Sequence, residues 1–447
     1  VYDFNLLVGK IGIIIFSFEA AIIYALRTNS VTTADSELLV NFAKSRQKAD
    51  ETKKYSGIAR GKNLIMIQVE SLENAVINQT IGGSEITPNL NQLARDGLYF
   101  SNYYGEVGPG NTADSEFTTL TSLYALQDDV VFVDYAQNNF QALPRLLVGN
   151  GYSAYGLHGD VPTFWNRSNI YPNLGYQKQF DYSDYKPSRS IGKGPSDLGD
   201  EDFFLQSADK IRGFSQPFMA TLITMSSHVP FELPKDLQTL AIPQDTKLSY
   251  TQQQYLESVH YADRAMGEFI SKLKQSGLYD NSVIAILGDH GSFTNISKAL
   301  GTDARELAGM SNSQVPLILL VPGGELKGEI TAPASHLDFF PTVANLLGIK
   351  APKSVLGQDV LNAKNPIVVH RNIVFGTINT ILSGSLAFQA NSDGVFSHGA
   401  CFLMPYKNPV PADKCLDIYN QQLNAIKASD IIIKGNLLSS YIKNLNY

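Results

Sequence analysis

Short apolar runs alternate with stretches of helical periodicity along most of this chain of 447 residues. Several runs are mostly apolar, as are strands buried on both faces of a sheet: Asn63–Val69, Ser153–Leu157, Phe218–Thr224, Ser282–Leu287 and Pro316–Val321. Helices are expected over Asn89–Asp96, Phe140–Gly149, Thr251–Gln275 and Ala334–Leu347. This alternation predicts an α/β fold with a doubly wound, mostly parallel central sheet flanked by helices.

The pattern changes past residue 370. Strand-like pieces at Ile373–Phe375 and Leu386–Phe388 alternate with turns, and a helical region follows over Cys415–Leu445. We therefore expect a main domain at residues 63–370 and a small C-terminal α+β domain at residues 371–447. Residues 32–62 are polar and helix-prone, and we expect them to form a connector.

The N-terminal residues are strongly apolar. Lys10, Ser17 and Glu19 interrupt the apolar character of residues 4–26. A helix that crosses a bilayer needs about 20 consecutive apolar residues, so residues 1–31 are interpreted as a juxtamembrane segment that lies at the membrane surface. A helix packed on the globular domain is the alternative.

Charge and cysteine content add two constraints. The net charge of -7 and the lack of a basic run argue against a nucleic-acid partner. The two cysteines, Cys401 and Cys415, stand 14 residues apart in a proline-rich segment. They could form one disulfide if the domain lies outside the cytoplasm, or remain two unpaired thiols.

Side chains that can carry chemistry follow several of the predicted strands. Glu70 follows the first strand, and His158 and His228 follow the next two. Asp289 and His290 follow a fourth. Ligands of such sheets bind beyond the carboxyl ends of the strands, so this shared placement predicts a single site.

A tight turn at Gly108–Asn111 places Thr112 at the start of a predicted helix, where unpaired N–H groups favour an anion. A hydroxyl there can attack a bound phosphate if its pKa is lowered. Glu70, Asp289 and His290 would complete an oxygen-rich set with one nitrogen, which suits Mn²⁺, Mg²⁺ or Zn²⁺. Such a metal would favour the Thr112 alkoxide. Taken singly, each of these residues also fits a structural role.

A second cluster contains His158, Trp165 and Arg167. The arginine fork fits a phosphate bidentately, and the tryptophan offers a flat face for a polyol backbone. The alternative is a surface loop with one buried aromatic. His228 could stabilise a leaving group or donate to phosphate, or be a core histidine. The remaining histidines are expected to be structural or peripheral: His260, His336, His370 and His398.

Residues 35–365 contain five informative runs: IQVESLENAVIN, TPNLNQLARDGLYFSNYYGEVGPGNTADSEF, LHGDVPTFWNR, ITMSSHVPF and LYDNSVIAILGDHG. In these runs the chain resembles the lipoteichoic acid synthases, which are phosphoglycerol transferases of the alkaline phosphatase/sulfatase superfamily. The resemblance implies a sulfatase-like catalytic domain with one Mn²⁺ held by Glu70, Thr112, Asp289 and His290. It also implies a glycerol phosphate group held by His158, Trp165, Arg167 and His228. The sulfatase signature Cys-x-Pro-x-Arg is absent, and Asn111 stands where many members have lysine.

The resemblance further implies an extracellular enzyme at the cell membrane. Thr112 would attack phosphatidylglycerol, diacylglycerol would leave with help from His228, and a glycerophospho-threonine would form. The glycerol end of a growing polyglycerolphosphate chain or a glycolipid anchor would then accept the group. Val31-Thr32-Thr33-Ala34 resembles a processing site, whose cleavage would release the domain.

The same chemistry is compatible with other acceptors. A primase would add only the first glycerol phosphate to a glycolipid, and other members would transfer it to a glucan or to water as a phosphodiesterase. A non-catalytic domain that binds the polymer is an alternative of another class, and an intact nucleophile and metal set argue against it.

Overall fold

The structure, a computed structural model, describes residues 32–45, 53–191, 198–302, 310, 313–372, 376–405 and 407–445. The expected juxtamembrane segment at residues 1–31 and the expected strand at Ile373–Phe375 lie outside these described residues. Among the described helices, none combines the length and the hydropathy that crossing a membrane would require.

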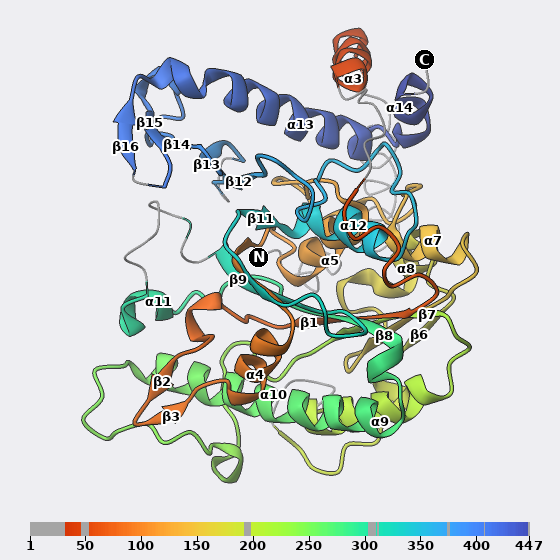
Figure 1. Ribbon diagram of the computed structural model, residues 1–447, viewed down its shortest axis with the longest axis vertical. Helices are drawn as coiled ribbons and strands as arrows, with labels where there is room; N and C mark the ends of the chain where they lie inside the picture. Colours follow the sequence, from red (N-terminus) through yellow and green to blue (C-terminus); the bar gives the residue numbers. More distant parts are fainter. Residues whose placement is uncertain are drawn as a thin grey trace, which may run out of the picture.

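A nine-stranded sheet forms the centre of the molecule (Figure 1). Its order is β10 (Gly328–Ile330), β4 (Leu98–Tyr104), β9 (Gln314–Leu320), β8 (Ser282–Gly288), β1 (Asn63–Val69), β7 (Phe218–Ile223), β5 (Ser153–His158) and β6 (Lys178–Phe180), with β11 (Ala334–Ser335) beside β4. Only β9 runs antiparallel to its neighbours in this sheet. The predicted α/β fold with a mostly parallel central sheet is therefore confirmed.

Helices cover both faces of this sheet, as Figure 1 shows. One face packs against α4 (Pro88–Asp96), α9 (Asp200–Arg212) and α10 (Tyr250–Gln275). The opposite face packs against α5 (Thr112–Thr121), α7 (Leu143–Val148), α8 (Arg167–Leu174) and α12 (His336–Leu346). Shorter elements are α6 (Val131–Asp134), α11 (Ile296–Leu300), β2 (Thr80–Ile81) and β3 (Ser84–Glu85).

A second, antiparallel sheet lies beyond α12. It contains β12 (Ile367–Arg371), β13 (Ile378–Ser383), β14 (Leu386–Gln389), β15 (Ala400–Leu403) and β16 (Asn408–Val410), in chain order. The boundary expected after residue 370 falls inside β12. Cys401 of β15 forms a disulfide with Cys415, and their Cα atoms are 5.9 Å apart. Of the two states that the sequence leaves open for these cysteines, the structure has the disulfide.

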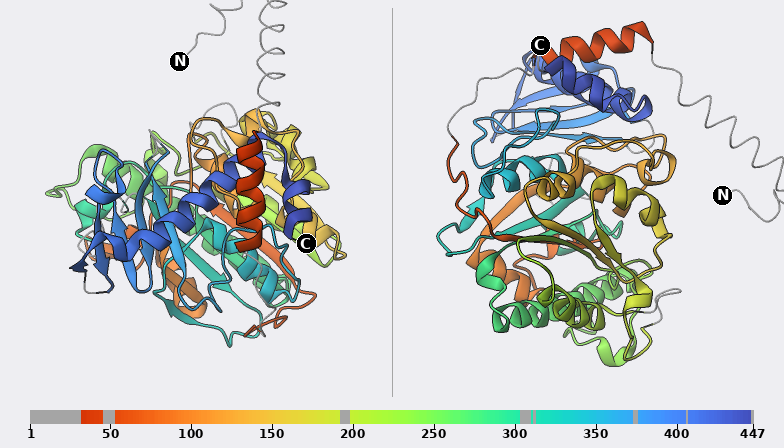
Figure 2. Two further views of the ribbon diagram at one scale, coloured as in Figure 1. Left: turned by 90° about the horizontal axis from the view of Figure 1, so that it is seen from above. Right: turned by 90° about the vertical axis from the view of Figure 1, so that its right-hand side faces the viewer.

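The N-terminal and C-terminal parts of the described chain meet on the second sheet. Helix α3 (Thr33–Ser45) lies across α13 (Leu416–Lys434) and beside α14 (Leu438–Leu445), as Figure 2 shows. Phe42 of α3 stacks on Tyr441 of α14 with ring centroids 6.3 Å apart. The segment expected to be a connector thus contains a helix with a buried face.

Strand β4 and helix α9 are two of the main-domain elements that the sequence did not predict. The segment of β4 was not predicted as a strand, because its aromatic and polar residues follow α4 after a single glycine, without a clear apolar run. Helix α9 was not predicted either, although its three N-terminal acidic residues suit the first turn of a helix. Strand β4 is fixed by its pairing with β9 and β10, and α9 by its packing on the sheet and on α10.

Candidate metal and nucleophile site

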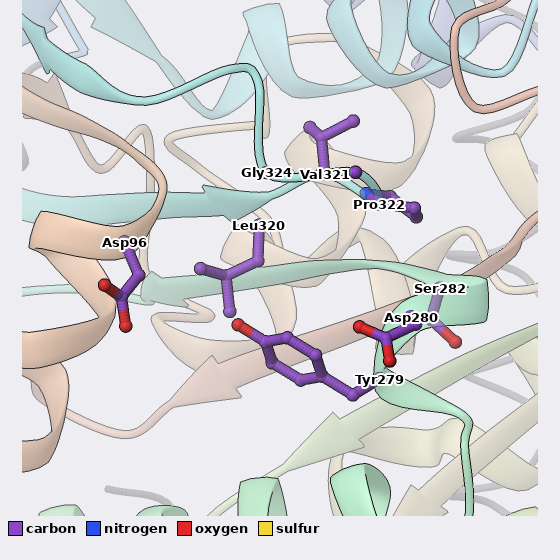
Figure 3. A pocket seen from close by; sticks show the side chains of 9 residues that line it. Asp96, Tyr279, Asp280, Ser282, Leu320, Val321, Pro322 and Gly324 are labelled. Carbon is purple, nitrogen blue, oxygen red and sulfur yellow. The ribbon is translucent and has the colours of Figure 1, made fainter.

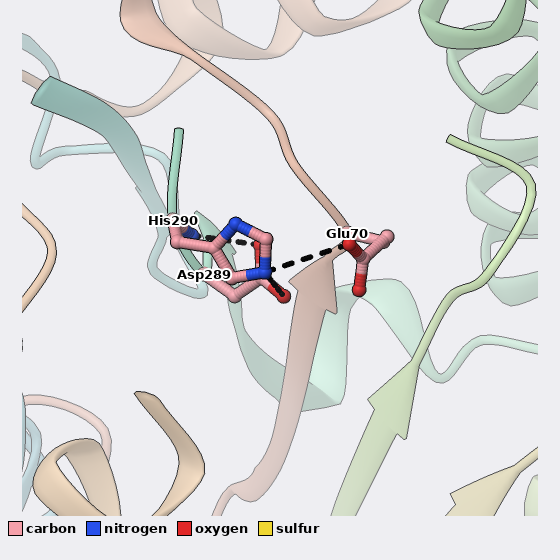
Figure 4. A group of neighbouring side chains, drawn as sticks. All are labelled: Glu70, Asp289 and His290. Atoms are coloured by element: carbon pink, nitrogen blue, oxygen red, sulfur yellow. Dashed lines mark hydrogen bonds and ion pairs between the residues drawn. The ribbon is translucent and has the colours of Figure 1, made fainter. Parts of the chain in front are cut away.

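Three side chains form a potential metal-binding group at the carboxyl ends of two neighbouring strands. Glu70 follows β1, and Asp289 and His290 follow β8. The strands pair in parallel with Val69 opposite Gly288, so the two strand ends meet. One potential ligand atom from each of the three residues lies within 4.8 Å of the others, and all three residues are buried (Figure 4).

The donor set of this group fits a hard divalent cation. His290 Nε2 lies 3.5 Å from Glu70 Oε1 and 3.4 Å from Asp289 Oδ2. His290 Nδ1 lies 2.9 Å from the Gly291 carbonyl oxygen, to which it can donate, and this leaves the Nε2 lone pair for a ligand. Asp289 Oδ2 is buried without a hydrogen-bond partner among the described atoms. A buried, unpartnered carboxylate oxygen beside an imidazole and a second carboxylate suits Mn²⁺, Mg²⁺ or Zn²⁺.

Electrostatics point the same way. Burial, together with the Glu70 carboxylate, raises the pKa of Asp289. Burial opposes the charged form of His290, but the Asp289 and Glu70 carboxylates outweigh it and raise the pKa of this imidazole. Without a cation, Asp289 and His290 therefore retain protons, which a bound cation would displace.

Thr112 joins this group from the first turn of α5. Its Oγ1 donates to Glu70 Oε2 at 3.1 Å and lies 3.5 Å from His290 Nε2. The four residues that the sequence proposed as metal ligands are thus brought together. The helix start is preceded by Asn111, whose φ of 41° completes the tight turn.

Asp114 shapes that turn, and the sequence reasoning did not single it out. Its Oδ2 accepts hydrogen bonds from the backbone N–H groups of Gly108, at 3.0 Å, and Gly110, at 2.8 Å. A Cβ on Gly110 would lie 2.7 Å from Asp114 Oδ1, so only glycine fits this close approach. An acidic residue in the first turn of a helix that follows a glycine-rich turn is the signal that could have identified it.

His158 sits at the end of β5, two strands along from β1. Its Nδ1 lies 3.0 Å from the Ile223 carbonyl oxygen, and its Nε2 is buried without a hydrogen-bond partner among the described atoms. Burial, with the nearby Arg167 guanidinium, keeps the pKa of His158 well below its ordinary value. The imidazole is therefore neutral and offers Nε2 as an acceptor for a hydroxyl.

The sequence predicts that the Arg167 guanidinium is free to bind a phosphate, but in the structure this guanidinium is hydrogen-bonded to Glu116. The guanidinium is fully buried, and Nε donates to Glu116 Oε1 at 3.1 Å while Nη2 donates to the same oxygen. Nη1 donates to the Phe164 carbonyl oxygen at 3.3 Å, and Tyr171 donates its hydroxyl to Glu116 Oε2 at 2.6 Å. In this arrangement Arg167 joins α8 to α5, so its phosphate-binding role stays a prediction.

Of the other two expected substrate-binding residues, Trp165 lies in a short 3-10 helix at Phe164–Asn166 and His228 lies in a loop. Trp165 is half-buried and has a φ of 52°, an unusual backbone conformation for a bulky residue. His228 is exposed just beyond β7, with its Nδ1 2.7 Å from the Val229 carbonyl oxygen. Burial raises the pKa of Glu70, but the neighbouring His290 and His228 side chains outweigh it and lower that pKa, so His228 lies within electrostatic reach of the metal-binding group.

Exposed apolar side chains accompany these residues, and we call Phe164, Val229 and Phe293 the apolar rim. Phe293 is 60% exposed, has a φ of 60°, and its ring centroid lies 5.9 Å from that of His290. Phe164 is stacked on His158 with centroids 6.2 Å apart, and Val229 directly follows His228. Three site histidines thus each have an exposed apolar neighbour.

A pocket of about 310 Å³ lies elsewhere (Figure 3). Asp96, Tyr279, Asp280 and Ser282 help to line it. Ser282 is the first residue of β8, whereas Asp289 follows its last, so this pocket and the metal-binding group lie at opposite ends of one strand.

Comparison with known proteins identifies the family of this chain. Residues 62–349 match the sulfatase family. The chain is 34% identical to lipoteichoic acid synthase 1 of Bacillus subtilis over 81% of this chain and 58% of that protein, and so spans less than two thirds of it. It is 30% identical to a lipoteichoic acid synthase-like protein of the same bacterium, over 98% of this chain and 70% of that protein.

A solved structure supports the same assignment. The lipoteichoic acid synthase LtaP from Listeria monocytogenes superposes with a TM-score of 0.80 at 30% identity, over 88% of this chain and 97% of that one. The central sheet and its flanking helices are thus those of a sulfatase-like fold. The chain belongs to the lipoteichoic acid synthase family of sulfatase-like proteins.

Proposed function

We propose that this chain is a phosphoglycerol transferase that moves glycerol phosphate from phosphatidylglycerol onto a growing polyglycerolphosphate chain. The observation that carries the proposal is the position of Thr112 Oγ1, 3.1 Å from Glu70 and 3.5 Å from His290 at the start of a helix. A hydroxyl among metal ligands at the N-terminus of a helix, where the helix dipole favours an anion, suits attack on a phosphodiester.

Each residue has a defined task in this reaction. Glu70 accepts the hydrogen bond of the Thr112 hydroxyl and so orients its lone pairs. A divalent cation held by Glu70, Thr112, Asp289 and His290 would lower the pKa of that hydroxyl and neutralise phosphoryl charge. The Thr112 hydroxyl gives up its proton to solvent and its oxygen bonds to phosphorus. The bond from phosphorus to the diacylglycerol oxygen breaks, and His228 supplies a proton to that oxygen.

The second half of the reaction repeats the displacement. An acceptor hydroxyl passes its proton to His228, which gave up a proton in the first half, and its oxygen bonds to the phosphorus of the glycerophospho-threonine. The bond from phosphorus to the Thr112 oxygen breaks, and that oxygen leaves deprotonated, as it was when it attacked. His158 would accept a hydrogen bond from a hydroxyl of the glycerol group at its Nε2, which has no hydrogen-bond partner among the described atoms. Two successive displacements at one nucleophile predict ping-pong kinetics.

Two observations support a lipid donor outside the cytoplasm. The apolar rim places exposed Phe164, Val229 and Phe293 beside site histidines, as an enzyme that meets diacylglycerol chains requires. The Cys401–Cys415 disulfide fits an oxidising compartment. We therefore propose an extracellular location at the cell membrane.

The test is the release of diacylglycerol from fluorescent phosphatidylglycerol, with and without Mn²⁺. Thr112→Val should abolish release, because it removes the hydroxyl at nearly constant volume. Thr119→Val is the matched control, since the Thr119 hydroxyl is buried in the same helix without a hydrogen-bond partner among the described atoms. If Thr112→Val retained release, the nucleophile would be wrong. Product size would separate polymer synthesis from priming and from hydrolysis.

A further inference from the structure

His336 joins two segments that meet at the candidate site. It is the first residue of α12 and has no exposed surface. Its Nε2 lies 3.0 Å from the Gly288 carbonyl oxygen, and its Nδ1 lies 3.2 Å from the Glu106 backbone nitrogen. Tyr103 contacts the ring edge-on, with centroids 5.6 Å apart.

The two backbone partners fix the protonation of this ring. A backbone N–H can only donate, so Nδ1 must accept from Glu106. A carbonyl oxygen can only accept, so Nε2 must carry the proton and donate to Gly288. His336 is therefore a neutral imidazole in one tautomer. Burial, which lowers its pKa to about 4, agrees with this assignment.

Each of the two backbone partners of His336 lies just before residues of the candidate site. Gly288 ends β8 and precedes the ligand pair Asp289 and His290. Glu106 follows β4 and stands just before the turn that begins at Gly108 and presents Thr112. These two segments come from different strands, and the His336 ring hydrogen-bonds both.

The surroundings hold His336 in place. A capping box between Ser335 and Asp338 fixes the start of α12. A Cβ on Gly105 would lie 3.4 Å from His336 Cε1 and 3.0 Å from the Asp289 carbonyl oxygen, so the two segments pass closely here. Because both ring nitrogens bond to backbone, His336 is not available as a metal ligand.

We propose that His336 is a positioning residue that sets the separation between Thr112 and the ligand pair Asp289–His290. This inference rests on the proposed function only for its activity readout, because its effect on metal binding is measurable without any substrate. The imidazole acts through its two backbone bonds and touches no reacting atom.

Two conservative variants separate the two bonds. In His336→Asn, the side-chain oxygen takes the position of Nδ1 and can still accept from Glu106, but the donor to Gly288 is lost. In His336→Gln, the amide nitrogen takes the position of Nε2 and can still donate to Gly288, but the acceptor for Glu106 is lost. His336→Phe keeps the ring and loses both bonds.

The experiment measures Mn²⁺ binding to each full-chain variant by titration, and kcat and KM for release from fluorescent phosphatidylglycerol. His336→Asn should weaken Mn²⁺ binding by about tenfold, as loss of groups that support metal ligands does. His336→Gln should keep Mn²⁺ affinity and lower kcat with KM little changed. His336→Phe should show both losses.

The control is His260→Gln, which alters a histidine of α10 whose Nδ1 bonds to the Ile86 carbonyl oxygen. It should change none of these quantities. Wild-type Mn²⁺ affinity and kcat in both the Asn and Gln variants would overturn the proposal, and so would equal losses of both quantities in the two variants. If the Phe variant failed to fold, the contrast between Asn and Gln would still decide. Absence of lipid release in the wild type would refute the proposed function and leave the Mn²⁺ contrast as the test of His336.

Discussion

The buried pair between Arg167 and Glu116 gives a prediction that separates stability from substrate binding. Both side chains are fully buried, and the arginine joins α8 to α5, the helix that begins with the proposed nucleophile. Removing either partner leaves the other charge buried and unpaired. Removing both, with methionine at each position, leaves two apolar side chains of similar size.

The expected magnitudes follow from this geometry. Loss of one partner of a buried, hydrogen-bonded pair costs about 3–5 kcal/mol of unfolding free energy, whereas an apolar replacement of both is often neutral. Arg167→Met and Glu116→Met should each lower stability by that amount. Glu116→Met also leaves the Tyr171 hydroxyl without its acceptor, which adds about 1–3 kcal/mol. The double variant should recover most of the loss due to Arg167→Met.

The assay measures urea unfolding and diacylglycerol release on the wild type, the two single variants and the double variant. We expect the double variant to regain stability but not release, because the predicted contact of Arg167 with phosphate would still be missing. If both single variants lost less than about 1 kcal/mol of unfolding free energy, Arg167 and Glu116 would not behave as a buried ion pair. Recovery of release in the double variant would refute the substrate-binding role of Arg167.

Three further predictions concern the rim, the cation and a buried acid. Phe293→Ser should slow release from phosphatidylglycerol vesicles several-fold and leave hydrolysis of a soluble short-chain analogue unchanged. Val395→Ser, which changes another exposed apolar side chain in the second sheet domain, should affect neither, and equal losses on both substrates would count against the apolar rim. Because the pKa values of Asp289 and His290 are raised, protons compete with the cation. Mn²⁺ affinity should therefore keep rising with pH beyond about 6.5, the ordinary histidine value. Calorimetry in buffers of different ionisation enthalpy should record proton release, and an affinity independent of pH would contradict this. Burial raises the pKa of Glu106 from 4.5 to about 8 despite Arg371, so its contribution to stability is complete below the ordinary value and is lost as pH rises through the folded-state value. Glu106→Gln should flatten the fall in the urea midpoint over that range, and an unchanged slope would show that another group is responsible.

The sequence predicts best where a pattern is local and strongly periodic. The strand at Asn63–Val69 and the helix at Tyr250–Gln275 are apolar or amphipathic over their whole length, and both form almost as expected. Because parallel strands end at one edge of a sheet, Glu70 and Asp289 could be expected to meet. The turn before Thr112 is likewise a local signal.

The sequence fails where tertiary contacts decide. The burial of Arg167 against Glu116 depends on how α8 packs on α5, which no local pattern encodes. The pairing of β4 with β9 depends on a reversed strand. The role of His336 as a bridge is invisible in the sequence, because its partners are backbone groups far away along the chain. Whether Cys401 and Cys415 form a disulfide depends on the redox state of the compartment, which the sequence leaves open.

The most direct test of the account is to trap the covalent intermediate. The protein would be mixed with phosphatidylglycerol and Mn²⁺, quenched during turnover, digested and analysed by mass spectrometry. We expect a glycerophosphoryl group on the peptide that carries Thr112, and no such group in Thr112→Val. Steady turnover with Thr112 unmodified, or the same group on another residue, would contradict it.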